Sequence, residues 1–216
     1  MTTPTHFIPT SSLYTQWAST YDHDSNVLQL LDDAAFNTHI LPLLNSLPPF
    51  TTILDLGCGT GRNTIKIYES LPRGKGCRIV ALDGSEAMMV IAKTRIAESG
   101  NQEKEEEGDI TWVHADISTS SMEIVKQKLT VGGGEGVDIV ISTLVLEHLP
   151  LETFFSAVSG VLKNGGWAWV TDMHVEMGAS RAGFRSGDGV KLQGESWNHA
   201  FEKVDFCGGA VCEGLR

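Results

Sequence analysis

The chain of 216 residues is long enough for one domain with a sizeable core, and its 41% hydrophobic and 20% charged residues are an ordinary globular balance. Sixteen Lys and Arg against 27 Asp and Glu give a formal net charge of −11, which disfavours nucleic-acid backbones and anionic membrane surfaces as partners. The first ten residues lack the features of a signal peptide, and no apolar run approaches the ~20 residues of a membrane span, so we expect no membrane insertion.

Helical and extended segments alternate along the chain, which predicts a parallel sheet with helices on both faces. Two helices come first, one over residues 12–22 and one, capped by Asp24 or Ser25, with an apolar face made of Val27, Leu30, Leu31 and Ala34. Strands are predicted over residues 51–56, 78–82, 111–115, 137–142 and 167–171. Helices are predicted over about 62–70, from a cap at Ser85, over 121–129, and over 151–162 with a stop at residues 164–166.

The rest of the chain has a weaker pattern. Five glycines lie within residues 174–195, which predicts an irregular segment, and Ser196 is placed to cap a last helix. The four cysteines form neither a disulfide framework nor a metal-binding pattern. We therefore expect no metal site, and free thiols in a reducing cytoplasm.

A glycine-rich turn follows the first predicted strand, which ends at Asp55. Glycines at positions 57, 59 and 61 let the backbone come close to a ligand, and the helix that follows offers its N-terminus to a negative group. A dinucleotide-binding fingerprint needs a further glycine at position 62, where this chain has Arg62. The alternative interpretation is a tight turn that binds nothing.

Two further carboxylates come at strand ends. Asp83 follows the second strand, where it would lie beside the glycine turn and accept hydrogen bonds from a ribose diol. Asp116 follows the third strand, where it could accept from the exocyclic amine of adenine while Met88 and Ile117 pack the ring. Taken singly, Asp83 also fits a residue that opens the turn to Ser85, and Asp116 fits a helix cap.

These segments together carry a family resemblance. Ile-Leu-Asp-Leu-Gly-Cys-Gly-Thr-Gly at 53–61, Ala-Leu-Asp-Gly-Ser at 81–85, Ala-Asp-Ile at 115–117 and Asp-Ile-Val-Ile-Ser at 138–142 resemble the class I S-adenosylmethionine-dependent methyltransferases, over residues 14–173. Val-Leu-Glu-His-Leu at 145–149 and the N-terminal Trp17 and Tyr21-Asp22 resemble the small-molecule branch that includes ubiquinone- and menaquinone-type enzymes.

The resemblance implies an α/β fold, a doubly wound Rossmann-like sheet with strand order 3-2-1-4-5-7-6, and S-adenosyl-L-methionine as cofactor. It implies a lid that contributes Tyr21, the methionine part of the cofactor near Asp55, ribose on Asp83 and adenine on Asp116. The expected cofactor-binding residues are Tyr21, Asp55, Gly57, Cys58, Gly59, Gly61, Asp83, Gly84, Met88, Asp116, Ile117 and Ser142.

Methyl transfer is an in-line displacement, so the protein contributes mostly by positioning the small-molecule acceptor. A phenol or alcohol acceptor also needs a base, whereas a carbon, amine or thiol acceptor needs little more. The predicted catalytic residues are His148 and His174, which follow the fourth and fifth strands, with His199 a further candidate. A structural histidine is the alternative at each position, and Glu147 is an alternative polar group.

The end of the chain departs from the family pattern. Only 43 residues follow residue 173, so strands six and seven of the family fold are expected to be absent. The fifth strand would then be an open edge that favours a homodimer or a partner subunit. We divide a single domain into a helical lid (1–45), a cofactor-binding core (51–173) and an irregular segment with a last helix (174–216). The rival functions are a cofactor-binding subunit without catalysis and a nicotinamide-dependent oxidoreductase, which Arg62 disfavours.

Overall fold

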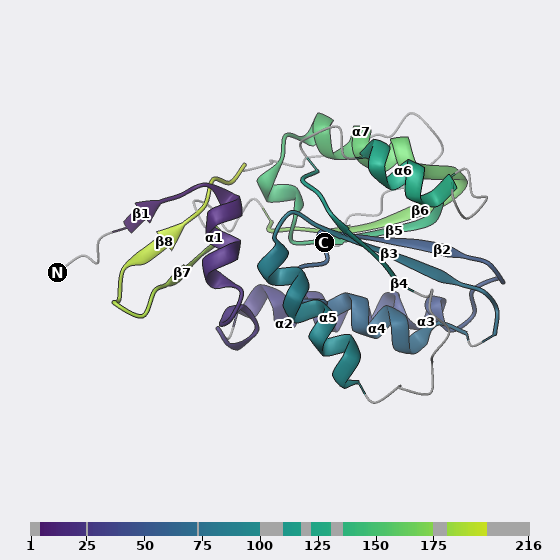
Figure 1. Ribbon diagram of the computed structural model, residues 1–216, viewed down its shortest axis with the longest axis horizontal. Helices are drawn as coiled ribbons and strands as arrows, with labels where there is room; N and C mark the ends of the chain where they lie inside the picture. Colours follow the sequence, from purple (N-terminus) through teal and green to yellow (C-terminus); the bar gives the residue numbers. More distant parts are fainter. Residues whose placement is uncertain are drawn as a thin grey trace.

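A five-stranded parallel sheet forms the centre of the molecule (Figure 1). The computed structural model describes residues 5–24, 26–72, 74–99, 110–117, 122–130, 136–174 and 181–197. In spatial order β4-β3-β2-β5-β6, the strands are β4 (Ile110–His114), β3 (Arg78–Asp83), β2 (Thr52–Leu56), β5 (Val137–Thr143) and β6 (Leu162–Thr171). This order confirms the predicted Rossmann-like fold for the first five strands of the family order.

Helices cover both faces of this sheet. On one face lie α2 (Val27–His39), α3 (Leu41–Leu44), α4 (Arg62–Ser70) and α5 (Glu86–Glu98). On the other lie α6 (Met122–Thr130) and α7 (Leu151–Val161). Short loops between parallel strands and helices bring all the strand ends to the same edge, where ligands bind in open α/β sheets.

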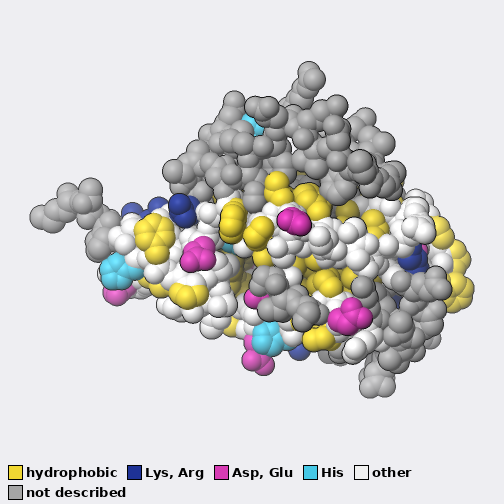
Figure 2. Space-filling view, turned by 90° about the horizontal axis from the view of Figure 1, so that it is seen from above, with side chains coloured by type: hydrophobic (Ala, Val, Ile, Leu, Met, Phe, Trp, Pro, Cys, Tyr) yellow, Lys and Arg dark blue, Asp and Glu magenta, His cyan; other side chains and the backbone are white. Residues whose placement is uncertain are grey.

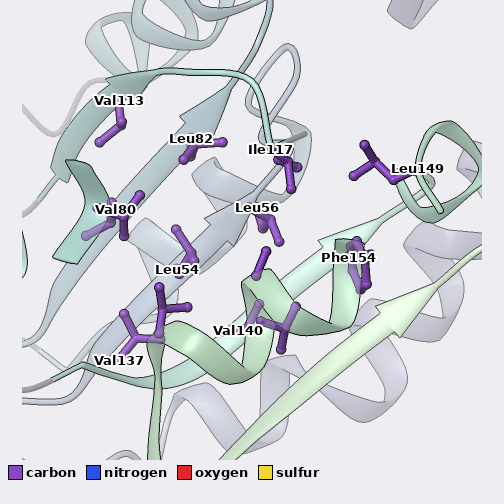
Figure 3. Packing of buried hydrophobic residues seen from close by; sticks show 14 of the residues in the cluster. Leu54, Leu56, Val80, Leu82, Val113, Ile117, Val137, Val140, Leu149 and Phe154 are labelled. Carbon is purple, nitrogen blue, oxygen red and sulfur yellow. The ribbon is translucent and has the colours of Figure 1, made fainter. Parts of the chain in front are cut away.

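Two hydrophobic clusters lie on opposite faces of the sheet because side chains alternate along each strand. The first cluster packs α6 and α7 onto the sheet and includes Leu54, Val140 and Phe154 (Figure 3). The second packs α2, α3 and α4 onto the other face and includes Ile53 and Ile139. Strands β2 and β5 supply both clusters, which is why their sequences are apolar almost throughout.

Helix α2 turns the opposite face to the protein from the one predicted. Its N-cap is Asn26, whose side chain accepts from the backbone N–H of Leu28, and Ser25 lies outside the described residues. The predicted apolar face is open, since Leu30 is 65% exposed and its neighbours are similar. The helix packs instead through Phe36 and a buried polar residue, Asp32, whose hydrogen bonds compensate its burial. Periodicity alone could not identify this face.

Strand β6 begins earlier than predicted. Helix α7 ends at Val161, and the pairing of β5 with β6 shifts register between Val137, opposite Leu162, and Ile139, opposite Trp167. Residues 163–166 occupy this bulge, and Gly165 there has a φ of 82° that favours glycine. The helix ends one residue before the predicted Leu162, and the Asn-Gly-Gly sequence forms an irregularity within β6.

The predicted irregular segment is partly wrong. Residues 181–197 contain two short antiparallel strands, β7 (Gly183–Arg185) and β8 (Lys191–Gln193). Strand β8 also pairs in parallel with β1 (Thr5–Phe7), so both ends of the described chain meet in a second sheet. This sheet lies with α1 (Thr10–Trp17) to one side of the main sheet (Figure 1). We call residues 5–24 and 181–197 together the cap.

The structure bears on the predicted open strand edge, the predicted last helix and the expected lack of membrane insertion. Within the described residues β6 pairs only with β5 and forms an edge of the main sheet. Residues 198–216, where the last helix was predicted, and with them His199, lie outside the described residues. In the part of the chain that is described, no helix has the length and apolarity to cross a membrane.

Candidate cofactor and acceptor site

The glycine turn after β2 uses each of its glycines differently. All three have positive φ, 78° at Gly57, 54° at Gly59 and 78° at Gly61. A Cβ at Gly57 would overlap the side chain of Val145, and one at Gly61 would lie 2.8 Å from the Cβ of Ala92. Apart from its two neighbours in the chain, a Cβ at Gly59 would meet no atom of the described residues within 4 Å. Two glycines therefore allow close packing, whereas Gly59 borders open space that a ligand can approach.

Asp83, at the end of β3, holds this turn in place. One carboxylate oxygen accepts from the backbone N–H of Gly59 at 2.7 Å, and the other accepts from that of Ser85 at 2.7 Å. Burial raises the pKa of Asp83, while these two backbone donors lower it. Asp83 thus opens the turn to Ser85, as one interpretation predicted, and the same carboxylate also binds the glycine turn.

Two predicted cofactor residues lie beneath the turn and bind other parts of the protein. Asp55 accepts from the hydroxyl of Thr64 at 2.5 Å, and burial raises the pKa of its carboxyl to about 6. The hydroxyl of Ser142 donates to the backbone carbonyl of Leu56 at 2.8 Å and is buried. These side chains tie β2 to α4 and β5 to β2, and so fix the strands from which the turn emerges.

The remaining predicted residues lie along the ends of β2, β3 and β4. Met88 is buried in the first turn of α5, whose cap is the predicted Ser85. Ile117 belongs to the first hydrophobic cluster, whereas Asp116 and Gly84 are exposed. Cys58 is buried as a free thiol, and burial raises its pKa well above the ordinary range. A thiol in that state is not a nucleophile at neutral pH.

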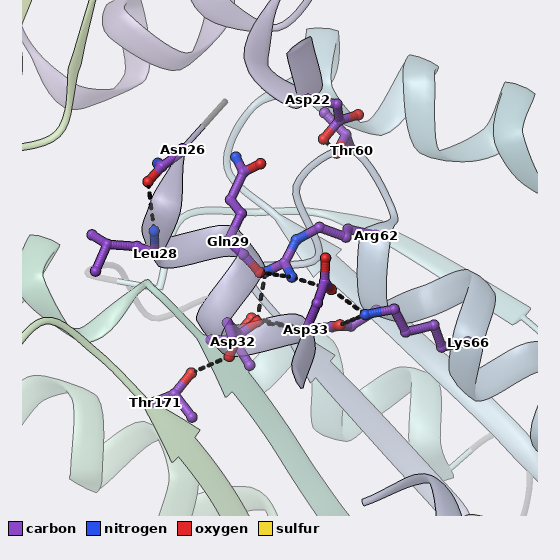
Figure 4. Close-up of polar contacts among 12 residues, drawn as sticks. Asp22, Asn26, Leu28, Gln29, Asp32, Asp33, Thr60, Arg62, Lys66 and Thr171 are labelled. Atoms are coloured by element: carbon purple, nitrogen blue, oxygen red, sulfur yellow. Dashed lines mark hydrogen bonds and ion pairs between the residues drawn. The ribbon is translucent and has the colours of Figure 1, made fainter. Parts of the chain in front are cut away.

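Arg62, which stands where a dinucleotide fingerprint would have glycine, has a structural role that the sequence did not suggest. Its guanidinium lies between Asp32, at 2.6 Å, and Asp33, at 2.5 Å, both on α2 (Figure 4). Asp32 also accepts from the hydroxyl of Thr171 at the end of β6, at 2.6 Å, and Asp33 also pairs with Lys66. The network joins α2, α4 and β6 directly behind the glycine turn.

The cap contacts the glycine turn through the 3-10 helix η1 (Tyr21–His23). The carboxylate of Asp22 accepts from the hydroxyl of Thr60 at 2.8 Å and pairs with Arg95 of α5 (Figure 4 shows Asp22 beside Thr60). Tyr21 is the predicted lid residue, and burial raises the pKa of its hydroxyl. Its segment is therefore fastened to the loop that the sequence assigns to the cofactor.

Aromatic side chains gather between the cap and the main sheet. The ring of Trp17 stacks on Phe184 with centroids 5.4 Å apart and meets the edge of Tyr21 at 4.9 Å. Tyr14 stacks on Trp17 at 5.9 Å and meets the ring of His148 edge-on at 5.3 Å. His148, in the 3-10 helix η2 (Leu146–His148) after β5, thus touches the cap directly.

Glu147 is the buried acid of this region. Its carboxyl faces the backbone N–H of Ala182, while one oxygen, Oε2, has no hydrogen-bond partner among the described residues. Burial, together with the charge of Asp172, raises its pKa to about 8, so the carboxyl is largely protonated at neutral pH. The backbone carbonyl of Glu147 accepts from the N–H of Trp197 at 2.5 Å. The cap thus contacts both ends of this residue.

The two predicted catalytic histidines differ in setting. His148 lies within the aromatic cluster, whereas His174 is exposed beyond the end of β6. Sequence reasoning missed Tyr14, although Tyr14, Trp17 and Tyr21 have the spacing of one helical face. Nothing in the sequence indicated Phe184, which reaches Trp17 from far along the chain. The described residues contain no group of three or more His, Cys, Asp or Glu side chains that could hold a metal ion.

Comparison with known proteins agrees with this geometry. A family model described as a methyltransferase domain matches residues 53–166. An uncharacterized methyltransferase of Emericella nidulans is 34% identical over 92% of this chain and 73% of its own length. A malonyl-[acyl-carrier protein] O-methyltransferase of Anoxybacillus flavithermus is 29% identical over 50% of this chain and 35% of its own length.

Solved structures support the fold. The DhpI–SAM–HEP complex superposes with a TM-score of 0.55 at 21% identity, covering 85% of this chain and 80% of that one. A carbon methyltransferase, CurJ, superposes with a TM-score of 0.53 at 18% identity over 72% of this chain and 38% of that one. The family match runs from within β2 to within β6 and includes the glycine turn, Asp83 and Asp116. The chain belongs to the class I S-adenosylmethionine-dependent methyltransferases.

Proposed function

We propose that this methyltransferase moves the methyl group of S-adenosylmethionine to an O, N, C or S atom of a small organic acceptor bound between the cap and the ends of β5 and β6. The observation that carries the proposal is the contact of Val145 with Gly57, because it brings the η2 segment against the glycine turn. His148 and Glu147 on that segment then border the cofactor on one side and the cap on the other.

The residues of the glycine turn fit the cofactor. The open space over Gly59 provides room for it, and the partly buried carboxylate of Asp83 can accept further hydrogen bonds from a ribose diol. We assign Tyr21, Gly57, Gly84, Met88, Asp116 and Ile117 to its surroundings, with Asp116 toward the adenine. Asp55, Cys58, Gly61 and Ser142 support the turn from beneath.

Charges around the cluster favour an acceptor without a negative charge. After burial and Tyr21, the acidic groups Glu147, Asp83 and Asp172 raise the pKa of Tyr14. The nearby cations Arg62 and Arg95 are already paired with carboxylates of α2 and η1. Figure 2 shows hydrophobic side chains gathered across the middle of one face, with a few acidic ones among them. The formal net charge of −11 disfavours a nucleic-acid acceptor.

The test is a turnover assay that measures S-adenosylhomocysteine over a panel of phenols, quinols, amines and thiols. Methylation of at least one class above the cofactor-only background is expected, and methylation of a quinol would support the ubiquinone- and menaquinone-type resemblance. Calorimetry accompanies the assay with S-adenosylmethionine and with a nicotinamide cofactor. Binding of the first without any turnover would favour the cofactor-binding subunit, and binding of the nicotinamide would contradict the assignment.

We also propose that the chain assembles through β6, as a homodimer or with a partner subunit, and that it is cytoplasmic. Among the described residues β6 pairs on one side only, and an open strand edge would support a homodimer or a partner subunit because it offers a row of hydrogen-bonding groups. Light scattering on the purified chain, compared at two concentrations, tests this directly. The buried thiols of Cys58 and Cys77 support a cytoplasmic location, which microscopy of the tagged protein would test.

A further inference from the structure

The hydrogen bonds of His148 fix which ring nitrogen carries the proton. Nδ1 lies 3.3 Å from the backbone carbonyl of Glu195, and Nε2 lies 2.7 Å from the hydroxyl of Tyr14. A carbonyl oxygen can only accept, so Nδ1 carries the hydrogen and donates it. Nε2 of the neutral ring then has only a lone pair, and the hydroxyl of Tyr14 must donate to it. The phenol oxygen keeps its own lone pairs free for another donor.

The hydroxyl of Tyr14 lies at the edge of the sheet where the cofactor binds. Burial is the main cause that raises its pKa, and Tyr21 with the acidic groups Glu147, Asp83 and Asp172 raises it further. The segment that carries His148 also contacts the glycine turn through Val145 and Gly57. Tyr14 therefore lies beside the segment that follows β5, and the same segment reaches the glycine turn through Val145.

We propose that Tyr14 is a catalytic residue that takes the proton of a hydroxyl-bearing acceptor, such as a phenol or alcohol, while passing its own proton to Nε2 of His148. The proposal rests on the methyltransferase function above and narrows its acceptor class to one that needs a base. A hydroxyl that stays protonated is a poor nucleophile, and a relay of this kind removes its proton in the transition state.

The relay balances in atoms and charge. When bound, S-adenosylmethionine supplies a methyl carbon on a positively charged sulfur, and the acceptor oxygen bonds to that carbon as the carbon–sulfur bond breaks and its electron pair stays on sulfur. The acceptor proton moves to the oxygen of Tyr14, and the original proton of Tyr14 moves to Nε2. His148 becomes an imidazolium as the positive charge on sulfur disappears, so the net charge of the site is unchanged.

The surrounding groups hold both residues in the states that the relay needs. Burial lowers the pKa of His148 to about 4, and burial with the charges of Tyr21, Glu147, Asp83 and Asp172 raises the pKa of Tyr14 well above its usual range. At neutral pH the imidazole is therefore neutral and the phenol protonated. Oε1 of Glu147 lies 3.8 Å from Nε2, and because this carboxyl is largely protonated at neutral pH it faces the ring as a polar, uncharged group.

The first test compares Tyr14→Phe with the wild type on two phenols of similar size. One is a nitrophenol that is ionised at the assay pH, and the other a methylphenol with a pKa of about 10. We expect kcat for the methylphenol to fall by about 10²- to 10⁴-fold and to recover as pH rises, while the nitrophenol loses only a few-fold. Tyr68→Phe, on α4 within the second hydrophobic cluster, is the matched control and should keep wild-type rates on both.

Further outcomes separate the relay from packing and from the proposed function. His148→Gln should reproduce the loss, and the double variant should lose no more than either single one, because the two residues act as a unit. Equal losses on both phenols, or no loss, would overturn the relay while leaving the methyltransferase assignment intact. Absence of turnover by the wild type on the whole panel would instead contradict the proposed function.

A measurement without turnover tests the geometry itself. Nitrogen-15 NMR of histidine-labelled protein, with His148 assigned by its loss in His148→Gln, should show hydrogen on Nδ1 and a bare Nε2 whose shift moves in Tyr14→Phe. Hydrogen on Nε2 would make Tyr14 the acceptor of this bond and would overturn the relay. Calorimetry should give the same S-adenosylmethionine affinity for Tyr14→Phe and wild type, so that a loss of rate is not a loss of binding.

Discussion

The main sheet and the cap are held together by different forces. In the sheet, β2 and β5 bury apolar side chains on both faces, and residues close in sequence form each strand, turn and helix. The cap joins two segments from opposite ends of the described chain, and it contacts the rest of the protein through side-chain hydrogen bonds, an ion pair and the edge-on contact of Tyr14 with His148. Its stabilising contacts are mostly polar or aromatic.

This difference matches the two halves of the reaction. The cofactor half needs a fixed backbone turn, and apolar packing with buried hydrogen bonds provides a rigid one. The acceptor half needs a wall that admits one molecule and releases another, and contacts of modest energy can open and close. The cofactor is shared by the family, and we propose that the acceptor is chosen where the cap meets η2.

The largest expected effect tests whether the hydrogen-bond and ion-pair network around Arg62 stabilises the main sheet as strongly as its apolar packing does. Arg62→Met leaves Asp32, whose side chain is 2% exposed, without its cation, so unfolding free energy should fall by about 3–5 kcal/mol. Chemical denaturation measures it. Lys163→Met removes a cation from Asp138, but that pair is about one-third exposed, so it should cost less than about 1 kcal/mol. Similar losses in both variants would mean that the network contributes no more than a surface pair.

The next effect is a pH dependence at the contact between sheet and cap. The pKa of Glu147 is raised to about 8 from 4.5, so the folded state keeps a proton that the unfolded state has lost, and stability falls as pH rises through this window. Asp55 contributes in the same direction only up to about pH 6. Between about pH 6 and 8 the wild type should therefore lose about 2–3 kcal/mol because of Glu147.

Denaturation of Glu147→Gln at the two pH values measures this contribution. Residue 147 cannot ionise in this variant, so its stability should no longer fall across the window and should rise by less than about 1 kcal/mol because the pKa of His148 is lowered to about 4. Glu152→Gln, an exposed position on α7, is the control and should keep the wild-type slope. A wild-type slope in Glu147→Gln would show that another group titrates there.

How far the sequence predicts the structure follows the same division. The limits of α4 and the Ser85 cap were correct because turn, cap and helix signals lie within a few residues of one another. Asp83 could be placed beside the glycine turn because parallel strands end at one edge of the sheet. Phe184 and Tyr14 could not, because their contacts depend on how distant segments meet. The buried face of α2 was mistaken because the bonds of Asp32 outweigh an apolar pattern.

A smaller effect should appear in cofactor affinity. Asp83→Asn replaces an acceptor oxygen by an amide that cannot accept from both Gly59 and Ser85, so the Kd for S-adenosylmethionine should rise roughly 10- to 100-fold. Isothermal calorimetry measures it. Asp138→Asn is the matched control: this Asp also accepts a backbone N–H, from Thr52, but at the opposite end of the strands. Its affinity should equal that of the wild type, and a comparable loss there would point to general damage to the sheet.

The smallest effect concerns the contact that fastens the cap to the sheet. Asp22 and Arg95 are each partly exposed, so a double-mutant cycle with Asp22→Asn and Arg95→Met should give a coupling of about 0.2–1 kcal/mol that shrinks in high salt. A coupling of this size can be broken and remade in each turnover, which an acceptor that enters beneath the cap requires. A coupling well above about 2 kcal/mol, unchanged by salt, would make the cap a fixed wall and require the acceptor to enter elsewhere.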